Sequence, residues 1–361
     1  MPTRDPVLHQ DLVVCTCGEK EYTARDTIEA AIFRGELDAT WKRFLVRVAA
    51  EKQAEEQDLD PDDAAISAAA EAFRYDHDLI TAEETEAWLE NRGLALDDFS
   101  DYFCRQYYAS VLQDIVTDEV EYISASSALR ELFVAELILS GELERMMSDL
   151  MWRLAARCAE TDRSPDLIAL DERKFFERNL IKRAQLANWL ERLGRDLNWF
   201  NEMLEMEAAY RRCCDKLLVP RARQRELVTL RLLLTRFETE FIQLESRDAA
   251  KEALFCVRED GMSMKEVATE GRYPYEQVDF IFEDLPADSQ QTLLGVSAGD
   301  VLEPVPRGDG FELWRLVKKV EPEPDDPSVK VRIDQRLLER HFSELVSKYI
   351  QRTLGDPISA E

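Results

Sequence analysis

The run from Gly310 to Val320 holds the side chains whose spacing most clearly indicates chemistry. It reads as a β-strand, and because side chains alternate along a strand, Glu312 and Trp314 share one face. A carboxylate in this position could hold a basic side chain or an N–H group of a bound peptide. It could equally face water, so both interpretations stay open from these residues alone.

Aromatic side chains accompany this strand. Phe241 follows Glu240 in the segment Phe237–Glu245, which also reads as a strand. Such residues could line a groove for a peptide, although aromatic residues at this spacing more often belong to a core. The candidate peptide-binding residues are Glu240, Phe241, Phe280, Phe282, Phe311, Glu312 and Trp314.

Motifs of two enzyme classes are missing from the sequence. It has no phosphate-binding glycine-rich loop and no His-Glu-x-x-His. The seven cysteines form no Cys-x-x-Cys pair. A metal or redox pair at Cys15 and Cys17, which would share one face of a strand, competes with ordinary burial of small residues. We therefore predict no catalytic residue, no metal site and no cofactor.

The segments around Glu312 follow a definite order. They read as an opening strand, a pair of helices, a turn followed by a strand, and a final strand, at Phe237–Glu245, Arg247–Gly261 with Ser263–Ala268, Gly299–Val305, and Gly310–Val320. This order, and most clearly Val296–Val320, resembles the parvulin family of prolyl isomerases. The resemblance implies a small α/β domain at about residues 228–320.

The same resemblance implies catalytic histidines that this chain lacks. Glu312 stands at one histidine position, and the other falls near Glu240 or Phe241. The only histidines lie outside this region, at His9, His77 and His341. Rotation about an X-Pro bond meets a barrier of about 20 kcal/mol, and catalysis requires contacts that strengthen in the twisted transition state. The interpretation is a peptide groove without isomerase chemistry; the alternative is a fold kept as a structural or dimerising element.

The N-terminal half contains an internal repeat. Arg34-Gly-Glu-Leu37 corresponds to Ser140-Gly-Glu-Leu143, and Trp88-Leu-Glu-Asn-Arg-Gly93 corresponds to Trp189-Leu-Glu-Arg-Leu-Gly194. In each Trp-Leu anchor the glycine is well placed to end one helix, before a leucine and a phenylalanine that begin the next. We predict two related helical units, at residues 1–115 and 116–227.

The ends of the chain resemble another family. Val13–Gly18 reads as a strand leading into helices, as in the N-terminal region of SurA-type chaperones, whose helices and final helix form a cradle for unfolded polypeptide. Val329–Leu354 has apolar residues at helical spacing and is the candidate closing helix, after an extended spacer at Glu321–Pro327. Residues 321–361 are thus predicted to end in a helix that packs on the helical units. The predicted fold class is α+β.

The charge and hydrophobicity of the chain restrict the kinds of molecule that it can bind. The formal net charge of −28 over 361 residues argues against binding of nucleic acid, whose phosphates require basic residues, and suits basic or neutral polypeptides better. The acidity could also serve solubility alone. No run approaches the roughly 18 apolar residues of a membrane span, and the first residues lack the apolar stretch of a signal peptide. We expect a cytoplasmic protein with reduced thiols and no membrane partner.

These observations together predict a non-catalytic chaperone or scaffold that binds unfolded peptide. A histidine-free chain of this arrangement is similar to the isomerase-related proteins of maturation systems for ribosomally made, post-translationally modified peptides. That resemblance implies a precursor peptide as client, or a peptide-modifying enzyme as partner. The alternatives are an active prolyl isomerase with a non-histidine site, a structural subunit of a peptide-modifying complex, and a peptide-modifying enzyme of a new kind. The oligomeric state is not predicted.

Overall fold

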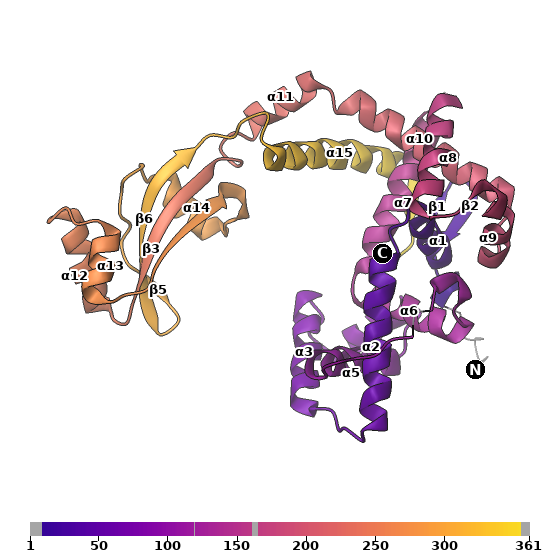
Figure 1. The fold of residues 1–361 in the computed structure, drawn as a ribbon, viewed down its shortest axis with the longest axis horizontal. Coiled ribbons are helices and arrows are strands. Elements are labelled where there is room, and N and C mark those ends of the chain that lie inside the picture. The colour runs from indigo at the N-terminus through magenta and orange to yellow at the C-terminus, as the bar shows by residue number, and fades with distance from the viewer. Residues whose placement is uncertain (1–8, 119, 161–164, 355–361) are drawn as a thin grey trace. The chain divides into compact units, whose positions relative to one another are not determined.

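The computed structural model describes residues 9–118, 120–160 and 165–354, and the chain divides into two compact units (Figure 1). Unit 1 comprises residues 1–215 and 340–361, and unit 2 comprises residues 216–339. Unit 1 is largely helical with a three-stranded sheet, and unit 2 is built on a four-stranded sheet. The fold class is α+β, as predicted.

The described part of unit 1 contains two successive sets of five α-helices in the same order. The first set is α1 (Ala24–Arg34), α2 (Asp38–Glu56), α3 (Asp63–Asp76), α4 (Ala82–Glu90) and α5 (Leu96–Val111). The second set is α6 (Ser127–Leu139), α7 (Glu142–Ala159), α8 (Pro165–Arg178), α9 (Leu186–Leu193) and α10 (Leu197–Leu217). Short 3₁₀ turns lie at η1 (His9–Asp11), η2 (Tyr122–Ser124) and η3 (Arg183–Gln185).

The glycines of the repeat have the same backbone conformation in both sets. Gly35 and Gly141 separate the first two helices of each set, and Gly93 and Gly194 separate the last two. All four have φ between +69° and +74°, a left-handed conformation that glycine adopts without a steric penalty. The helical corners predicted at both anchors are therefore confirmed.

The two sets share one core. Phe33 of α1 stacks on Phe175 of α8 with ring centroids 4.8 Å apart, and its edge meets Phe200 of α10 at 5.7 Å. Trp41 of α2 packs against Phe133 of α6 at 4.9 Å. Large aromatic side chains contribute much of the apolar area that a core buries. These contacts hold the first set to the second within a single unit.

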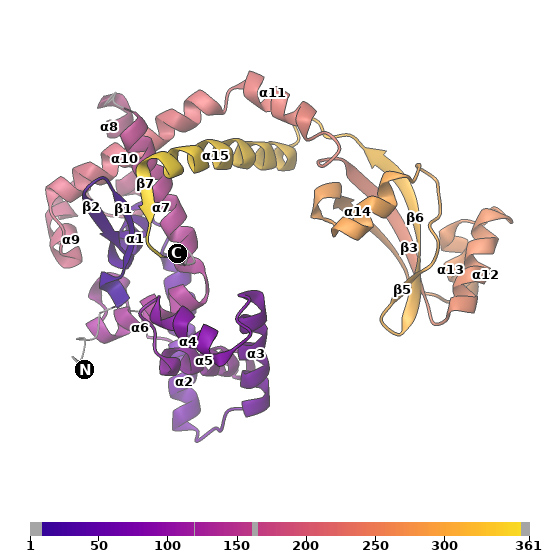
Figure 2. The same ribbon diagram turned by 180° about the vertical axis from the view of Figure 1, so that it is seen from behind.

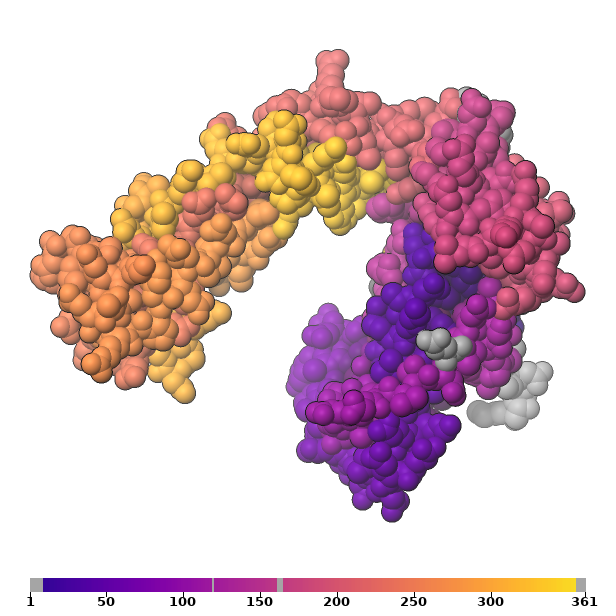
Figure 3. All heavy atoms as spheres, in the orientation of Figure 1, coloured from indigo at the N-terminus to yellow at the C-terminus, as the bar shows by residue number. Residues whose placement is uncertain are grey.

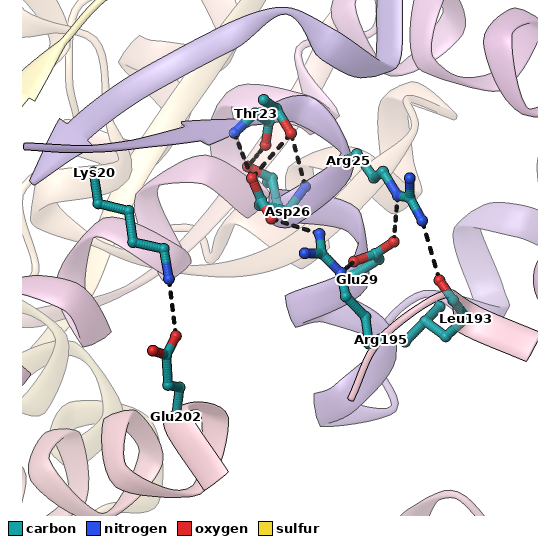
Figure 4. Close-up of polar contacts among 9 residues, drawn as sticks. Lys20, Thr23, Arg25, Asp26, Glu29, Leu193, Arg195 and Glu202 are labelled. Atoms are coloured by element: carbon teal, nitrogen blue, oxygen red, sulfur yellow. Dashed lines mark hydrogen bonds and ion pairs between the residues drawn. The ribbon is translucent and has the colours of Figure 1, made fainter. Parts of the chain in front are cut away.

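A network of ion pairs joins α1 to the corner between α9 and α10 (Figure 4). Arg195 binds Asp26 at 2.6 Å and also contacts Glu29, and Arg25 donates to Glu29 at 2.7 Å and to the carbonyl oxygen of Leu193 at 3.1 Å. Glu29 is buried, which raises the pKa of its carboxyl, and the two arginines oppose that rise. The network therefore depends on the arginines to hold a buried charge.

The first and last described strands pair with each other in unit 1. Strands β1 (Val13–Cys17), β2 (Lys20–Thr23) and β7 (Ile350–Arg352) form an antiparallel sheet in the order β2-β1-β7. Before β7, the last helix α15 (Pro327–Tyr349) buries Phe342, which stacks on Trp152 and Tyr210, each at 5.1 Å. The predicted closing helix is confirmed, except that its last residues pair with the otherwise free edge of β1 as a strand.

Unit 2 follows the order expected from the sequence. Its elements are α11 (Pro220–Thr229), β3 (Arg236–Leu244), α12 (Arg247–Arg258), α13 (Met264–Gly271), β4 (Tyr275–Ile281), η4 (Phe282–Asp284), α14 (Ala287–Leu294), β5 (Val305–Arg307) and β6 (Gly310–Val320). The sheet is antiparallel in the order β4-β3-β6-β5. The segment between Ala268 and Ile281, to which the sequence assigned no element, contains the edge strand β4.

Helices lie on both sides of this sheet, and the two opposite views agree on their placement (Figures 1 and 2). Helices α12 and α13 cover one face, where Ile242 and Leu313 are fully buried. Helix α14 lies on the other side, and its Leu293 packs with Phe237 and Leu316. The tip of the β5–β6 hairpin projects beyond the helices (Figure 3). Among the described helices, none combines the length and apolar character that a membrane span requires.

Candidate functional site

Strand register brings one aromatic pair and two carboxylates onto the α14 side of the sheet. Phe241 of β3 lies opposite Trp314 of β6 and opposite Glu276 of β4. Glu312 lies opposite Gln243, and this pair is two residues away from the Phe241–Trp314 pair on both strands. Residues directly opposite in antiparallel strands share a face, as do residues two apart in one strand. We call these five residues the aromatic–acidic face.

The centre of the aromatic–acidic face is a fixed aromatic stack. The rings of Phe241 and Trp314 are 4.3 Å apart and inclined by 21°. Trp314 Nε1 donates a hydrogen bond of 3.0 Å to Glu312 Oε2. Phe241 is buried and Trp314 is half-buried, so the indole is the accessible part of the stack. Since the ring is held before any ligand arrives, binding on it costs little side-chain entropy.

The two carboxylates differ in their surroundings. Glu312 is only 8% exposed, and its one ion pair within the described chain is with Arg307, whose Nε lies 3.9 Å away and whose side chain is 77% exposed. Glu276 is exposed and forms no ion pair with the described residues. Glu312 thus serves mainly to orient Trp314, whereas Glu276 is free to meet a ligand. Aromatic rings and carboxylates both attract cations.

A hollow of about 360 Å³ opens at the end of the sheet beside Glu312. Its walls include Gln243, Glu312 and Arg307, together with Pro274 and Phe311. Carboxylate, amide and guanidinium groups converge there with apolar surface, which is the mixture that small binding sites use. The hollow extends the aromatic–acidic face toward the β5–β6 hairpin.

Of the remaining candidate residues from the sequence, two lie on the opposite face and two belong to the core on the α14 side. Glu240 is on the opposite face, where it accepts a 2.7 Å hydrogen bond from the hydroxyl of Tyr275; burial, and next this hydrogen bond, raise the pKa of Tyr275. Phe311 packs with the core beneath α12 and α13. Phe282 is 2% exposed and belongs to the core with Phe237, against which Phe280 is also stacked at 6.0 Å. Phe280 lies opposite Phe237 on the α14 side of the sheet, the side on which Glu276 also lies. The candidates from sequence therefore divide between the two faces of the sheet, because neighbouring residues of a strand point to opposite faces.

Glu276 and Gln243 were not among the candidates from sequence. Gln243 lies on a predicted strand, and alternation from Phe241 could have placed it on the same face. Glu276 could not be found in this way, since its position depends on β4 and on the register between β4 and β3. No residue of the face is a histidine.

A larger hollow of about 800 Å³ lies between the end of α12 and the loop of residues 295–302. Its arginines are already bound within the chain. Arg258 contacts Glu303 and the carbonyl oxygen of Val301, each at 2.6 Å, and Arg315 donates to the carbonyl oxygen of Gly299 at 3.3 Å. This hollow therefore offers weaker chemistry than the aromatic–acidic face. No group of three or more acidic, cysteine or histidine side chains suited to a metal occurs among the described residues.

No protein-family model and no curated protein matches this chain. Among solved structures, the peptidylprolyl isomerase PrsA from Bacillus cereus matches 69% of this chain and 95% of its own, at 12% identity and a TM-score of 0.35. PrsA from Bacillus anthracis matches 56% and 94%, at 15% identity and a TM-score of 0.28. A structure of the SurA-like chaperones PEB4 and Cj1289 of Campylobacter jejuni matches 59% and 86%, at 8% identity and a TM-score of 0.19. Likenesses with TM-scores this low show no shared function.

Proposed function

We propose that this protein binds unfolded or precursor peptides on the aromatic–acidic face of unit 2, as a chaperone or scaffold without isomerase activity. The observation that carries the proposal is the Phe241–Trp314 stack, held by Glu312 and flanked by Glu276. Half-buried tryptophan rings that are fixed in place are typical anchors of binding sites.

The chemistry of the face indicates the peptides that would bind. A lysine or arginine side chain could lie over the indole and reach Glu276, which combines a cation–π contact with an ion pair. The net charge of −28 would bring basic segments toward the protein at low salt. We therefore expect a preference for extended, basic peptides, and binding that weakens as salt is added.

The groups on the face support the proposal that peptides bind without isomerase activity. Glu312 stands where the parvulin resemblance implies a histidine, and its carboxylate is engaged by the Trp314 N–H group. The face has no histidine that could donate to the twisted amide, so it favours no transition state over the planar peptide. Binding without turnover is the expected behaviour.

The identity of the client peptide is a more specific proposal than peptide binding itself. A precursor peptide of a ribosomally made, modified peptide, presented to its modifying enzyme in the cytoplasm, is the client that the arrangement of the sequence suggests. Its support is the histidine-free parvulin-like domain joined to a duplicated helical unit.

The test measures binding and turnover on the same peptides. Fluorescence anisotropy would follow the binding of labelled unstructured peptides that share one proline-containing core and carry three lysines, three serines or three glutamates. A parallel assay would follow cis–trans exchange at the proline by NMR. The proposal predicts saturable binding in the order lysine, serine, glutamate, with exchange at the uncatalysed rate. Catalysed exchange would make an unconventional isomerase the better account, and the absence of any binding would favour a structural subunit.

A further inference from the structure

Two cysteine thiols from distant parts of unit 1 lie in contact. Cys17 Sγ of β1 and Cys158 Sγ of α7 are 3.3 Å apart, although 141 residues separate them in sequence. Cys158 is exposed and Cys17 is half-buried. Both thiols are thus close to each other, and one of them is open to solvent.

The surroundings of Cys17 and Cys158 differ from those of Cys15, which the sequence indicated as a candidate partner of Cys17. Cys15 is fully buried, and burial raises the pKa of its thiol to about 12. Cys17 lies nearer the surface, where Arg157 and Lys20 partly oppose the rise in the pKa of its thiol that burial causes. Lys20 itself reaches across to Glu202 at 2.8 Å (Figure 4). The exposed end of β1 therefore presents two thiols in contact, with two basic side chains nearby.

We propose that Cys17 and Cys158 form a thiol–disulfide exchange site that a low-molecular-weight disulfide oxidises. In the first step the Cys158 thiolate attacks one sulfur of the small disulfide; a mixed disulfide forms at Cys158 and one small thiolate leaves. In the second step the Cys17 thiolate attacks Cys158 Sγ, the Cys17–Cys158 bond forms and the second small thiolate leaves. The two protein thiols lose two protons and two electrons, which the small disulfide receives as it becomes two thiols.

The solvent exposure of Cys158 makes it the first thiol to attack a small disulfide. Burial, and next the hydrogen bond and charge of Cys158, raise the pKa of Cys17 to about 11, so Cys17 is a poor first nucleophile. Once Cys158 carries the mixed disulfide, it no longer contributes a hydrogen bond or a charge. The thiolate of Cys17 then becomes more accessible at the moment when the second step requires it.

The bond would connect strand β1 to helix α7 within unit 1. Strand β1 pairs with β2 and with β7, and α7 is the second helix of the second set. A Cys17–Cys158 bond would close a loop of more than a hundred residues, which restricts the unfolded chain strongly. We expect the melting temperature of unit 1 to rise by about 5–10 °C.

The experiment treats the full-length protein with oxidised glutathione and maps its peptides without reduction. The expected result is a cross-linked peptide pair containing Cys17 and Cys158, a melting temperature raised as above, and reversal of both by dithiothreitol. Cys158→Ser should abolish the cross-link and the shift, while Cys256→Ser in unit 2 should keep them. The peptide map of the unmutated protein tests the pairing even if a variant folds poorly. A glutathione adduct that persists on Cys158 without closing, or a different pairing, would overturn the proposal.

Discussion

Replacement of Arg195 by methionine tests how unit 1 holds its buried charge. The change removes the guanidinium group and keeps an apolar chain of similar length. Arg195 contacts Asp26 and Glu29, and Glu29 is only 2% exposed (Figure 4). Among the residues that the structure describes, the variant leaves Arg25 as the only one whose guanidinium contacts the Glu29 carboxylate.

The expected loss of folding stability is large for the replacement of a single side chain near the surface. Removal of one partner from a buried ion pair costs about 3–5 kcal/mol. Arg25 remains, and the Arg195 side chain is 25% exposed, so we expect about 2–3 kcal/mol at pH 7. In a unit of this size each kcal/mol lowers the melting temperature by about 2–4 °C, which gives a decrease of about 4–12 °C.

The pH dependence has a definite sign. Burial raises the pKa of Glu29, and loss of Arg195 raises it further. A carboxyl whose folded pKa lies above its unfolded value contributes stability at pH values below the unfolded pKa, and that contribution is lost as pH rises through the folded pKa. The difference between the variant and the original protein should therefore shrink as pH falls from 7 toward about 4.

The assay is urea unfolding at a series of pH values, followed by circular dichroism. Arg192→Met is the matched control, because Arg192 pairs with Glu121 at 2.7 Å between side chains that are 43% and 73% exposed. Such exposed pairs contribute about 0–1 kcal/mol. Equal stability of the two variants at pH 7, or a deficit of the Arg195 variant that grows as pH falls, would refute the reasoning.

Two further predictions concern the aromatic–acidic face and the repeat. Glu312→Gln keeps an acceptor for the Trp314 N–H group, so peptide affinity should change less than about 3-fold. Glu312→Ala removes the acceptor and should weaken peptide affinity by about 10-fold. Equal losses of affinity in anisotropy titrations would instead indicate direct contact between the carboxylate and the peptide. Gly93→Ala should lower the free energy of unfolding by about 1–2 kcal/mol because φ is positive at Gly93. Gly194→Ala should lower it more, because the added Cβ would lie 3.0 Å from Arg25 Nη2. A larger loss of stability for Gly93→Ala in urea unfolding would contradict this.

The helical corners of unit 1 could be predicted because their signals are local. Each needs only a Trp-Leu pair and a glycine at fixed spacing, and the left-handed conformation of Gly93 and Gly194 follows from helix termination. The same holds for Glu312 and Trp314, which share a face because they are two apart in one strand.

Contacts between segments could not be predicted in this way. The sequence left open whether Glu240 or Phe241 shares a face with Glu312 and Trp314. The register between β3 and β6 places Phe241 there, because a shift of one residue moves a side chain to the other face. The segment Tyr275–Ile281 follows Pro274 and lacks a regular alternation of apolar and polar residues, so no strand was predicted there and Glu276 was missed. The contact between Cys17 and Cys158 spans 141 residues and depends on how β1 packs on α7.

The most direct test of the central claim compares Trp314→Ala with Phe255→Ala in peptide binding. Phe255 lies on α12 in the same unit, is 58% exposed and does not belong to the aromatic–acidic face. For a fluorescent lysine-containing unstructured peptide, removal of the indole should weaken binding by about 30-fold or more, because buried aromatic anchors typically contribute at least 2 kcal/mol. The Phe255 variant should bind within about 2-fold of the original protein. Unchanged affinity in a folded Trp314→Ala protein would contradict the account.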